Sequence, residues 1–239
     1  MILTYPDDCI QSLVASWWQD TGETTPCQWR LAWAFVPHVD QQPYLLVPKS
    51  RTDDREHDRV ECDITPCNVS SPPLYSRLPV AALPTNPGES LTVYRAKKRP
   101  VIIVAGLGPE VPKEVKTGYP NRHFAPAYLC IPSYGVDQKT GKRAGYPPAF
   151  ISRVKACEYP QFFWDKLPVP GADESILRLD QLQPVGGHYQ SLEMTQFRLG
   201  EEAIPVMEEW LQWHFTGKIQ EDGLIAFWLE MLGRHPSRA

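Results

Sequence analysis

The sequence has no long apolar run, no Cys-X-X-Cys pair and no excess of positive charge. A membrane-spanning helix needs about 18 or more consecutive apolar residues, so none is expected here. The start, Met1-Ile-Leu-Thr-Tyr-Pro-Asp-Asp8, lacks the basic residues and apolar stretch of a secretion signal. We therefore expect a cytoplasmic protein with no membrane contact, whose six cysteines are free thiols in a reducing compartment.

The formal net charge is −4 at pH 7, from 24 Lys and Arg against 28 Asp and Glu. A protein that coats nucleic acid through its overall charge is normally basic. This composition excludes that mode of binding. Any contact with RNA must come from a local basic patch.

Proline is abundant, with 25 residues, which is about twice its average usage. Because proline has no backbone N–H, it is disfavoured in helix interiors and central strands. Hydrophobic residues make up 42% of the chain and include eight Trp, enough for a sizeable core. These features predict a mainly β (α+β) protein with short strands and many loops.

The N-terminal part is predicted to be an extension, residues 1–75, which ends in the polar, charged and proline-bearing stretch 49–73. Apolar residues at helical spacing predict a short amphipathic helix in 6–20. Alternation predicts a strand at 29–36, with 44–47 as its hairpin partner. This extension is either an added domain that recognises a partner or an extra layer on the rest of the chain. A helix and a hairpin bury little surface alone, so we expect the extra layer.

The second part, residues 76–239, combines short strand patterns with two amphipathic helices. Strands are predicted at 77–83, 101–105, 127–131, 150–154 and 175–182, and helices at 200–215 and 220–232. Four successive β-branched residues at 101–104 indicate a strand buried on both faces.

Four short motifs occur in a fixed order in this second part. They are Pro87-Gly88-Glu89, Arg99-Pro100-Val101-Ile102-Ile103-Val104, Cys130-Ile131-Pro132-Ser133 and Ser175-Ile176-Leu177-Arg178-Leu179-Asp180-Gln181-Leu182. With the helix at 200–215 behind them, they resemble the MazF/PemK family of toxin–antitoxin endoribonucleases over residues 84–217. The resemblance implies a small SH3-like β barrel with C-terminal helices, no cofactor and no metal. It also implies a homodimer, an antitoxin protein as partner and single-stranded RNA as substrate.

The resemblance assigns one catalytic role to Arg99 and places its hydroxyl partner at Ser133 or Tyr134. Metal-free RNA cleavage uses the ribose 2′-hydroxyl as nucleophile, and the protein must stabilise the charge that develops on the phosphate. A planar guanidinium suits this role because it binds phosphate oxygens in pairs. His123, in the loop after the Arg-Pro strand, is a candidate general acid or base.

A basic cluster is the candidate RNA-binding surface, and three further polar residues are expected to support the site. The basic residues are Arg95, Lys97, Lys98, Lys139, Lys142 and Arg143, and the supporting residues are Glu89, Asp180 and Gln181. A solvated charged face would explain the same basic residues equally well.

The function predicted from these features is a metal-independent, sequence-selective endoribonuclease of toxin–antitoxin type. One alternative is a catalytically inactive SH3-like module that binds RNA or a protein partner. Another is a β-rich protein unrelated to the family. His57, Cys62 and Cys67 are spaced too widely for a typical zinc site, and no fourth ligand is evident, so no metal is expected.

Overall fold

The computed structural model describes residues 3–50, 52–53, 55–56, 59–70, 89–105, 108–119, 124, 126–136, 145–170, 174–188 and 190–234. The chain divides into two compact units. Unit 1 comprises residues 1–35 and 98–239, and unit 2 comprises residues 36–97. The predicted boundary at 75/76 and the predicted strand at 77–83 both lie outside the described residues.

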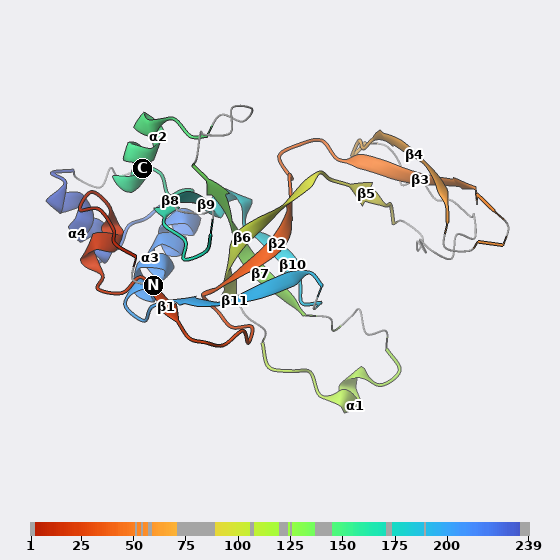
Figure 1. The fold of residues 1–239 in the computed structure, drawn as a ribbon, viewed down its shortest axis with the longest axis horizontal. Helices are drawn as coiled ribbons and strands as arrows, with labels where there is room; N and C mark the ends of the chain where they lie inside the picture. The colour runs from red at the N-terminus through yellow and green to blue at the C-terminus, as the bar shows by residue number, and fades with distance from the viewer. Residues whose placement is uncertain are drawn as a thin grey trace. The chain divides into compact units, whose positions relative to one another are not determined.

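Unit 1 is built on a mainly antiparallel sheet of eight strands (Figure 1). Its strands, in sheet order, are β1 (Trp18–Asp20), β11 (Leu192–Leu199), β2 (Arg30–Pro37), β6 (Ala96–Ala105), β7 (Ala127–Gly135), β9 (Ser175–Arg178) and β8 (Phe162–Asp165), and β10 (Gln183–Gly186) also pairs with β7. The register is antiparallel in β1–β11, β11–β2, β6–β7, β7–β9, β8–β9 and β10–β7. This confirms the predicted broad class, mainly β with few helices.

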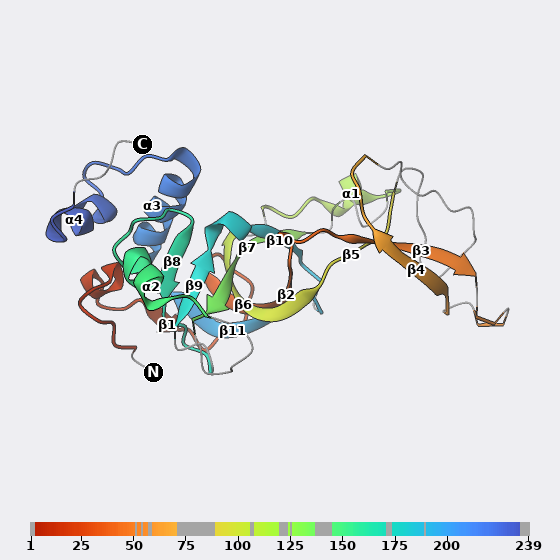
Figure 2. The same ribbon diagram turned by 90° about the horizontal axis from the view of Figure 1, so that it is seen from above.

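The described helices are short apart from one. They are α1 (Lys113–Lys116), α2 (Pro148–Lys155), α3 (Ala203–Thr216) and α4 (Leu224–Met231), with 3₁₀ turns at Ile10–Leu13 and Leu179–Gln181. The two helices predicted at 200–215 and 220–232 are confirmed as α3 and α4. Figure 2 shows α3 beside β8, whereas α4 lies farther from these strands.

The main core lies between α3 and one face of the sheet. Val206 and Trp210 of α3 share this core with Leu31 of β2 and Ile102 of β6. Trp210 packs edge-on against Phe163 of β8, with the ring centroids 4.7 Å apart. The indole N–H of Trp210 also donates to the Pro160 carbonyl at 3.0 Å, so its one polar group is satisfied.

The central strand β6 is buried on both of its faces, as its four β-branched residues predict. Ile102 and Val104 face the core under α3, and alternation turns Val101 and Ile103 to the opposite face. All four side chains are at most 6% exposed. Arg99 lies in this same strand, two residues before Val101, so the buried half of β6 gives it a rigid base.

The N-terminal residues are tied to β8 by a buried carboxylate. Asp165, which is fully buried, accepts hydrogen bonds from Tyr5 Oη at 2.8 Å, Trp17 Nε1 at 3.1 Å and the Lys166 backbone N–H at 2.8 Å. Burial raises the pKa of Asp165 to about 7, although these hydrogen bonds act in the opposite direction. These bonds, together with β1 and β2, make residues 3–35 part of unit 1.

Two predictions for the N-terminal part are wrong. The expected helix in 6–20 is reduced to the 3₁₀ turn Ile10–Leu13, because β1 pairs with β11 and the Trp17 carbonyl accepts from Gly200 N–H at 2.8 Å. The expected hairpin of 29–36 with 44–47 does not form. Instead β2 lies between β11 and β6, where both of its edges are paired.

Unit 2 holds a separate three-stranded sheet. β3 (Tyr44–Ser50) pairs with β4 (Glu61–Pro66) on one side and with β5 (Thr92–Val93) on the other. Most of its described side chains are exposed, and Leu45 is the one of β3 that is buried. The partner that the sequence assigned to β2 thus belongs to this second sheet.

Three predictions for the second part are also corrected. The expected strand at 150–154 is the helix α2, which starts with Pro148 in its first turn and stacks the Phe150 ring between Tyr146 and Tyr159. The strand at 127–131 runs on through Pro132 to Gly135. The segment 175–182 is a strand only to Arg178, because a 3₁₀ turn follows.

Candidate functional site

The arginine of the Arg-Pro motif and Tyr134 meet on neighbouring strands. The register pairs Val101 with Pro132, so Arg99, two residues before Val101, lies opposite Tyr134, two residues after Pro132. The Arg99 Cζ atom lies 3.9 Å from the centroid of the Tyr134 ring. This distance is typical of a cation–π contact, and it holds the guanidinium against a partly buried ring.

A second guanidinium faces the same ring. The Cζ atom of Arg178, at the end of β9, lies 5.6 Å from the Tyr134 ring centroid and 5.0 Å from that of Phe162. Asp180 holds this side chain in a two-pronged ion pair, with Nε–Oδ1 at 2.7 Å and Nη2–Oδ2 at 2.6 Å. These hydrogen bonds raise the pKa of Arg178 above its ordinary value, so its charge is permanent.

The Tyr134 hydroxyl donates a hydrogen bond to Oε1 of Gln181. Gln181 and Asp180 both belong to the 3₁₀ turn that follows β9, so one turn orients both the tyrosine and Arg178. We call Arg99, Tyr134, Arg178, Asp180 and Gln181 the Arg99–Tyr134 cluster. Four of these residues were predicted as site or supporting residues, and the structure brings them together.

Arg178 was missed as a site residue by sequence reasoning. It lies two residues before Asp180 in the Ser175–Leu182 motif, and that motif was available as a signal. The turn at Leu179–Gln181, which brings Asp180 to the Arg178 guanidinium, was not predicted from the sequence.

A row of aromatic rings continues from the cluster. Phe162 packs edge-on against Phe150 at 5.1 Å, and Phe150 stacks on Tyr146 at 5.3 Å and on Tyr159 at 5.7 Å between ring centroids. All four side chains are partly exposed. Flat rings beside fixed cations are suited to stacking of unpaired nucleic-acid bases.

Ser133 lies outside the cluster. Side chains alternate along β7, so Ser133 projects to the opposite face from Tyr134 and lies beside Leu177 in the main core. It is 2% exposed, and its hydroxyl has no hydrogen-bond partner among the described residues. Of the two hydroxyls predicted near Arg99, only that of Tyr134 lies in the cluster.

The remaining predicted residues are dispersed. Lys98 forms an ion pair with Glu193, and its Nζ atom lies 5.8 Å from the Trp33 ring centroid. Its ammonium group therefore interacts with two neighbouring residues of the same sheet. Three belong to unit 2: Arg95, which donates to Gln41 at 3.0 Å, and the exposed residues Lys97 and Glu89. The others, His123, Lys139, Lys142 and Arg143, lie outside the described residues.

No metal site or membrane helix is found in the part of the chain that the structure describes. There, no group of three or more His, Cys, Asp or Glu side chains is arranged to hold a metal ion. Nor does any described helix have the length and hydrophobicity to cross a membrane. Cys62 and Cys67 are partly exposed thiols of unit 2, and His57 lies outside the described residues.

The cluster can bind an oxyanion and place a carboxylate beside it. Arg99 and Arg178 converge on one ring, so both guanidinium groups are preorganised rather than free to rotate. Asp180 adds an acceptor and Tyr134 a hydroxyl. Comparisons of this chain with protein-family models, curated proteins and solved structures find no match, so its function is argued from this geometry.

Proposed function

We propose that unit 1 binds single-stranded RNA at the Arg99–Tyr134 cluster and cleaves it without a metal ion. The observation that carries this proposal is the convergence of two guanidinium groups on one tyrosine ring, at 3.9 Å and 5.6 Å. Guanidinium pairs bind phosphate oxygens, and the adjoining rings of Phe162, Phe150 and Tyr146 offer flat surfaces to the bases.

In the proposed reaction the ribose 2′-oxygen attacks the neighbouring phosphorus and loses its proton to the Asp180 carboxylate. The bond from phosphorus to the 5′-oxygen breaks, and the leaving oxygen takes a proton from the Tyr134 hydroxyl or from water. Arg99 and Arg178 stabilise the negative charge that develops on the phosphate. The products are a 2′,3′-cyclic phosphate and a free 5′-hydroxyl.

The proposal includes an SH3-like barrel formed by β11, β2, β6, β7 and β10. In support, each of these strands pairs with the next in that order, and β10 and β11 are joined by the short segment 187–191. That segment contains a turn in which Ser191 N–H donates to the His188 carbonyl at 2.8 Å. A homodimer and an antitoxin partner belong to the same hypothesis.

A second candidate is an RNA-binding module that does not cleave. The burial of Ser133 on the opposite face favours it, because the cluster then holds one hydroxyl, and Gln181 already accepts from that hydroxyl. Binding would use the same two guanidinium groups. The two candidates differ only in what happens to the RNA after it binds.

The test is incubation of the purified protein with a long mixed-sequence RNA in EDTA, comparing wild type with Arg99→Ala and Arg178→Ala. Arg198→Ala is the matched control, since Arg198 is also ion-paired on the sheet but lies outside the cluster. We expect discrete fragments with cyclic phosphate ends, slowed about 100-fold or more in both cluster variants and unchanged in the control. Binding without fragments supports the second candidate, and neither binding nor fragments from folded protein contradicts both.

A further inference from the structure

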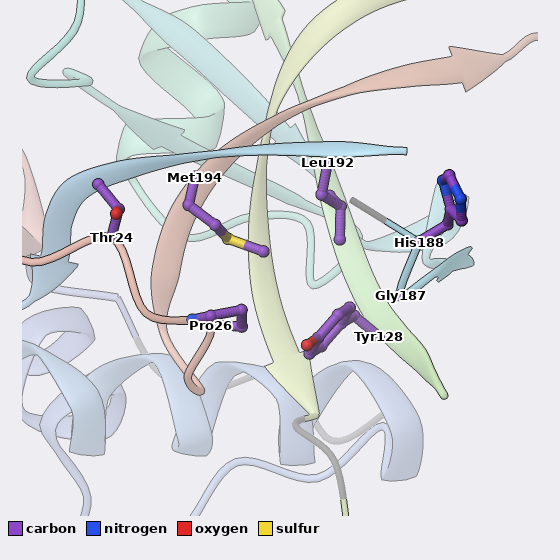
Figure 3. A pocket seen from close by; sticks show the side chains of 7 residues that line it. All are labelled: Thr24, Pro26, Tyr128, Gly187, His188, Leu192 and Met194. Atoms are coloured by element: carbon purple, nitrogen blue, oxygen red, sulfur yellow. The ribbon is translucent and has the colours of Figure 1, made fainter. Parts of the chain in front are cut away.

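A pocket of about 410 Å³ opens on unit 1 at the other end of β7 from the cluster (Figure 3). Its lining residues are Thr24, Pro26, Tyr128, Gly187, His188, Leu192 and Met194. Tyr128 and Tyr134 are six residues apart along the strand, which corresponds to about 20 Å. The pocket is therefore separate from the Arg99–Tyr134 cluster.

The walls of the pocket are mainly apolar, with Thr24 and His188 as polar members, and come from three parts of the chain. Leu192 and Met194 project from β11 towards Tyr128 of β7, and Pro26 lies opposite Met194 in the segment between β1 and β2. The volume falls within the range of small-molecule pockets. Among the described residues that line it, none is Asp, Glu, Lys or Arg and one is His188, so a neutral ligand fits better than an ion.

One polar group inside the pocket is the hydroxyl of Tyr128. Tyr128 is 4% exposed, and within the described residues nothing donates to or accepts from its hydroxyl. Burial raises the pKa of Tyr128, so this hydroxyl remains protonated and can donate. The ring is buried but the hydroxyl is open to the pocket, so a ligand that accepts its hydrogen bond would take the place of water there.

The tyrosine ring is held in place by the turn between β10 and β11. A Cβ atom on Gly187 would lie 2.9 Å from Pro126 Cγ and 3.3 Å from Tyr128 Cε2, so glycine lets the backbone approach the ring edge. Gly187 N–H also donates to the Pro126 carbonyl at 2.7 Å. The hydroxyl is thus presented from a fixed position, as a recognition group requires.

We propose that this pocket binds a neutral, flat heteroaromatic ring, which accepts a hydrogen bond from Tyr128 Oη. The ring would lie between the Met194 thioether and Leu192 on one side and Pro26 on the other, a set of contacts that favours polarizable flat surfaces. The ring could be a base of bound RNA or a free compound such as a nucleoside. This inference goes beyond the proposed function and does not depend on it.

The test is NMR of protein whose methionine methyl groups carry ¹³C, titrated with each of the four ribonucleosides. Met194 lines the pocket, whereas Met207 is in the main core and Met231 is exposed on α4, so the last two are internal controls. We expect a saturable shift of the Met194 signal alone, with Kd around 1 mM for a ligand of this size. Tyr128→Phe should weaken binding about tenfold through loss of one hydrogen bond, and Tyr119→Phe, at an exposed tyrosine, should not.

Toluene is the second probe on the unchanged protein, because it is flat but accepts no hydrogen bond. The inference is overturned if no nucleoside shifts Met194, if toluene binds as tightly as the best nucleoside, or if folded Tyr128→Phe binds unchanged. An unchanged Met207 signal shows that the Tyr128→Phe variant is folded. If the variant does not fold, the comparison of toluene with the nucleosides on wild-type protein still tests the inference.

The same titration in Arg99→Ala separates this inference from the proposed function. Nucleoside binding that persists in that variant supports the pocket whatever becomes of RNA cleavage. A short oligoribonucleotide then identifies the source of the ring. If it displaces the nucleoside from wild type, the pocket takes an RNA base, and if the nucleoside stays bound, the pocket takes a free compound.

Discussion

The carboxylate of Glu209 on α3 accepts the backbone N–H of Leu224, the first residue of α4, at 2.8 Å. Its other oxygen accepts from Ile225 N–H at 3.2 Å. Gly223 precedes the helix and has no side chain that could cap it. A side chain of one helix thus supplies the cap that the sequence of the next helix lacks.

We expect Glu209→Ala to lower the free energy of unfolding by about 1–2 kcal/mol, since one buried and one partly buried backbone N–H group lose their acceptor. Gly223→Ala should have a similar effect, because a Cβ there would lie 2.1 Å from Glu209 Oε1. Chemical denaturation checks both, with Glu208→Ala as the matched control at the exposed neighbouring position. Equal stability of Glu208→Ala and Glu209→Ala would contradict the capping role.

The buried carboxylate of Asp165 makes stability depend on pH in an unusual direction. Its pKa is raised from 3.8 to about 7, so the folded state holds a proton that the unfolded state releases above about pH 4. This contribution is fully present below the unfolded pKa and is lost as the pH rises through 7. We expect the free energy of unfolding to fall by up to about 4 kcal/mol between pH 4 and 7.

Asp165→Asn is the variant that checks this pH dependence. The amide cannot titrate, and its oxygen can still accept from Tyr5 and from the Lys166 N–H. Denaturation curves across this pH range should be flatter for the variant than for wild type. Parallel curves for the two proteins would show that Asp165 is not the responsible group.

Within the proposed function, the ring and the hydroxyl of Tyr134 can be separated. Tyr134→Phe removes the hydrogen bond to Gln181 but keeps the ring under Arg99. We expect RNA binding to persist and single-turnover cleavage to slow about 10- to 100-fold. Tyr134→Ala removes the ring as well and should weaken binding too. Equal cleavage by wild type and Tyr134→Phe would exclude a chemical role for the hydroxyl.

The six free cysteines should fall into two reactive classes. Cys9, Cys130 and Cys157 are buried, and burial raises the pKa of Cys9 to about 11 and that of Cys130 to about 12. Cys27, Cys62 and Cys67 are partly exposed. A thiol-specific chromogenic reagent at pH 8 should therefore label these three quickly, and the other three only in denaturant. Rapid labelling of more than three thiols in the native protein would contradict this burial.

The strongest local patterns could be interpreted from the sequence. The β-branched run at Val101–Val104 predicts a buried strand, and the apolar stripes of α3 and α4 predict amphipathic helices. Both patterns reflect which side chains are buried. Pairing partners could not be predicted in this way. The strand β2 pairs with β11, far along the chain, and nothing within β2 encodes that choice.

The candidate site, like the fold, could be predicted only in part from the sequence. Arg99 and Tyr134 were expected together because the resemblance assigns a catalytic pair to these two positions, and the register of β6 with β7 places them opposite each other. The role of Arg178 depends on a three-residue turn, and the exclusion of Ser133 depends on which face of β7 meets the core. Both are decided by tertiary packing rather than by the motif.

The placement of unit 2 between β2 and β6 has a consequence for how this chain can be altered. These two strands are neighbours in the sheet and run in opposite directions, as the bond from Trp29 N–H to the Ile103 carbonyl and that from His38 N–H to the Arg95 carbonyl show. Unit 2 is therefore an excursion whose two ends already meet. A short turn from β2 into β6 could replace it without changing the order of any strand in the main sheet, and the cost of closing that loop varies only slowly with its length.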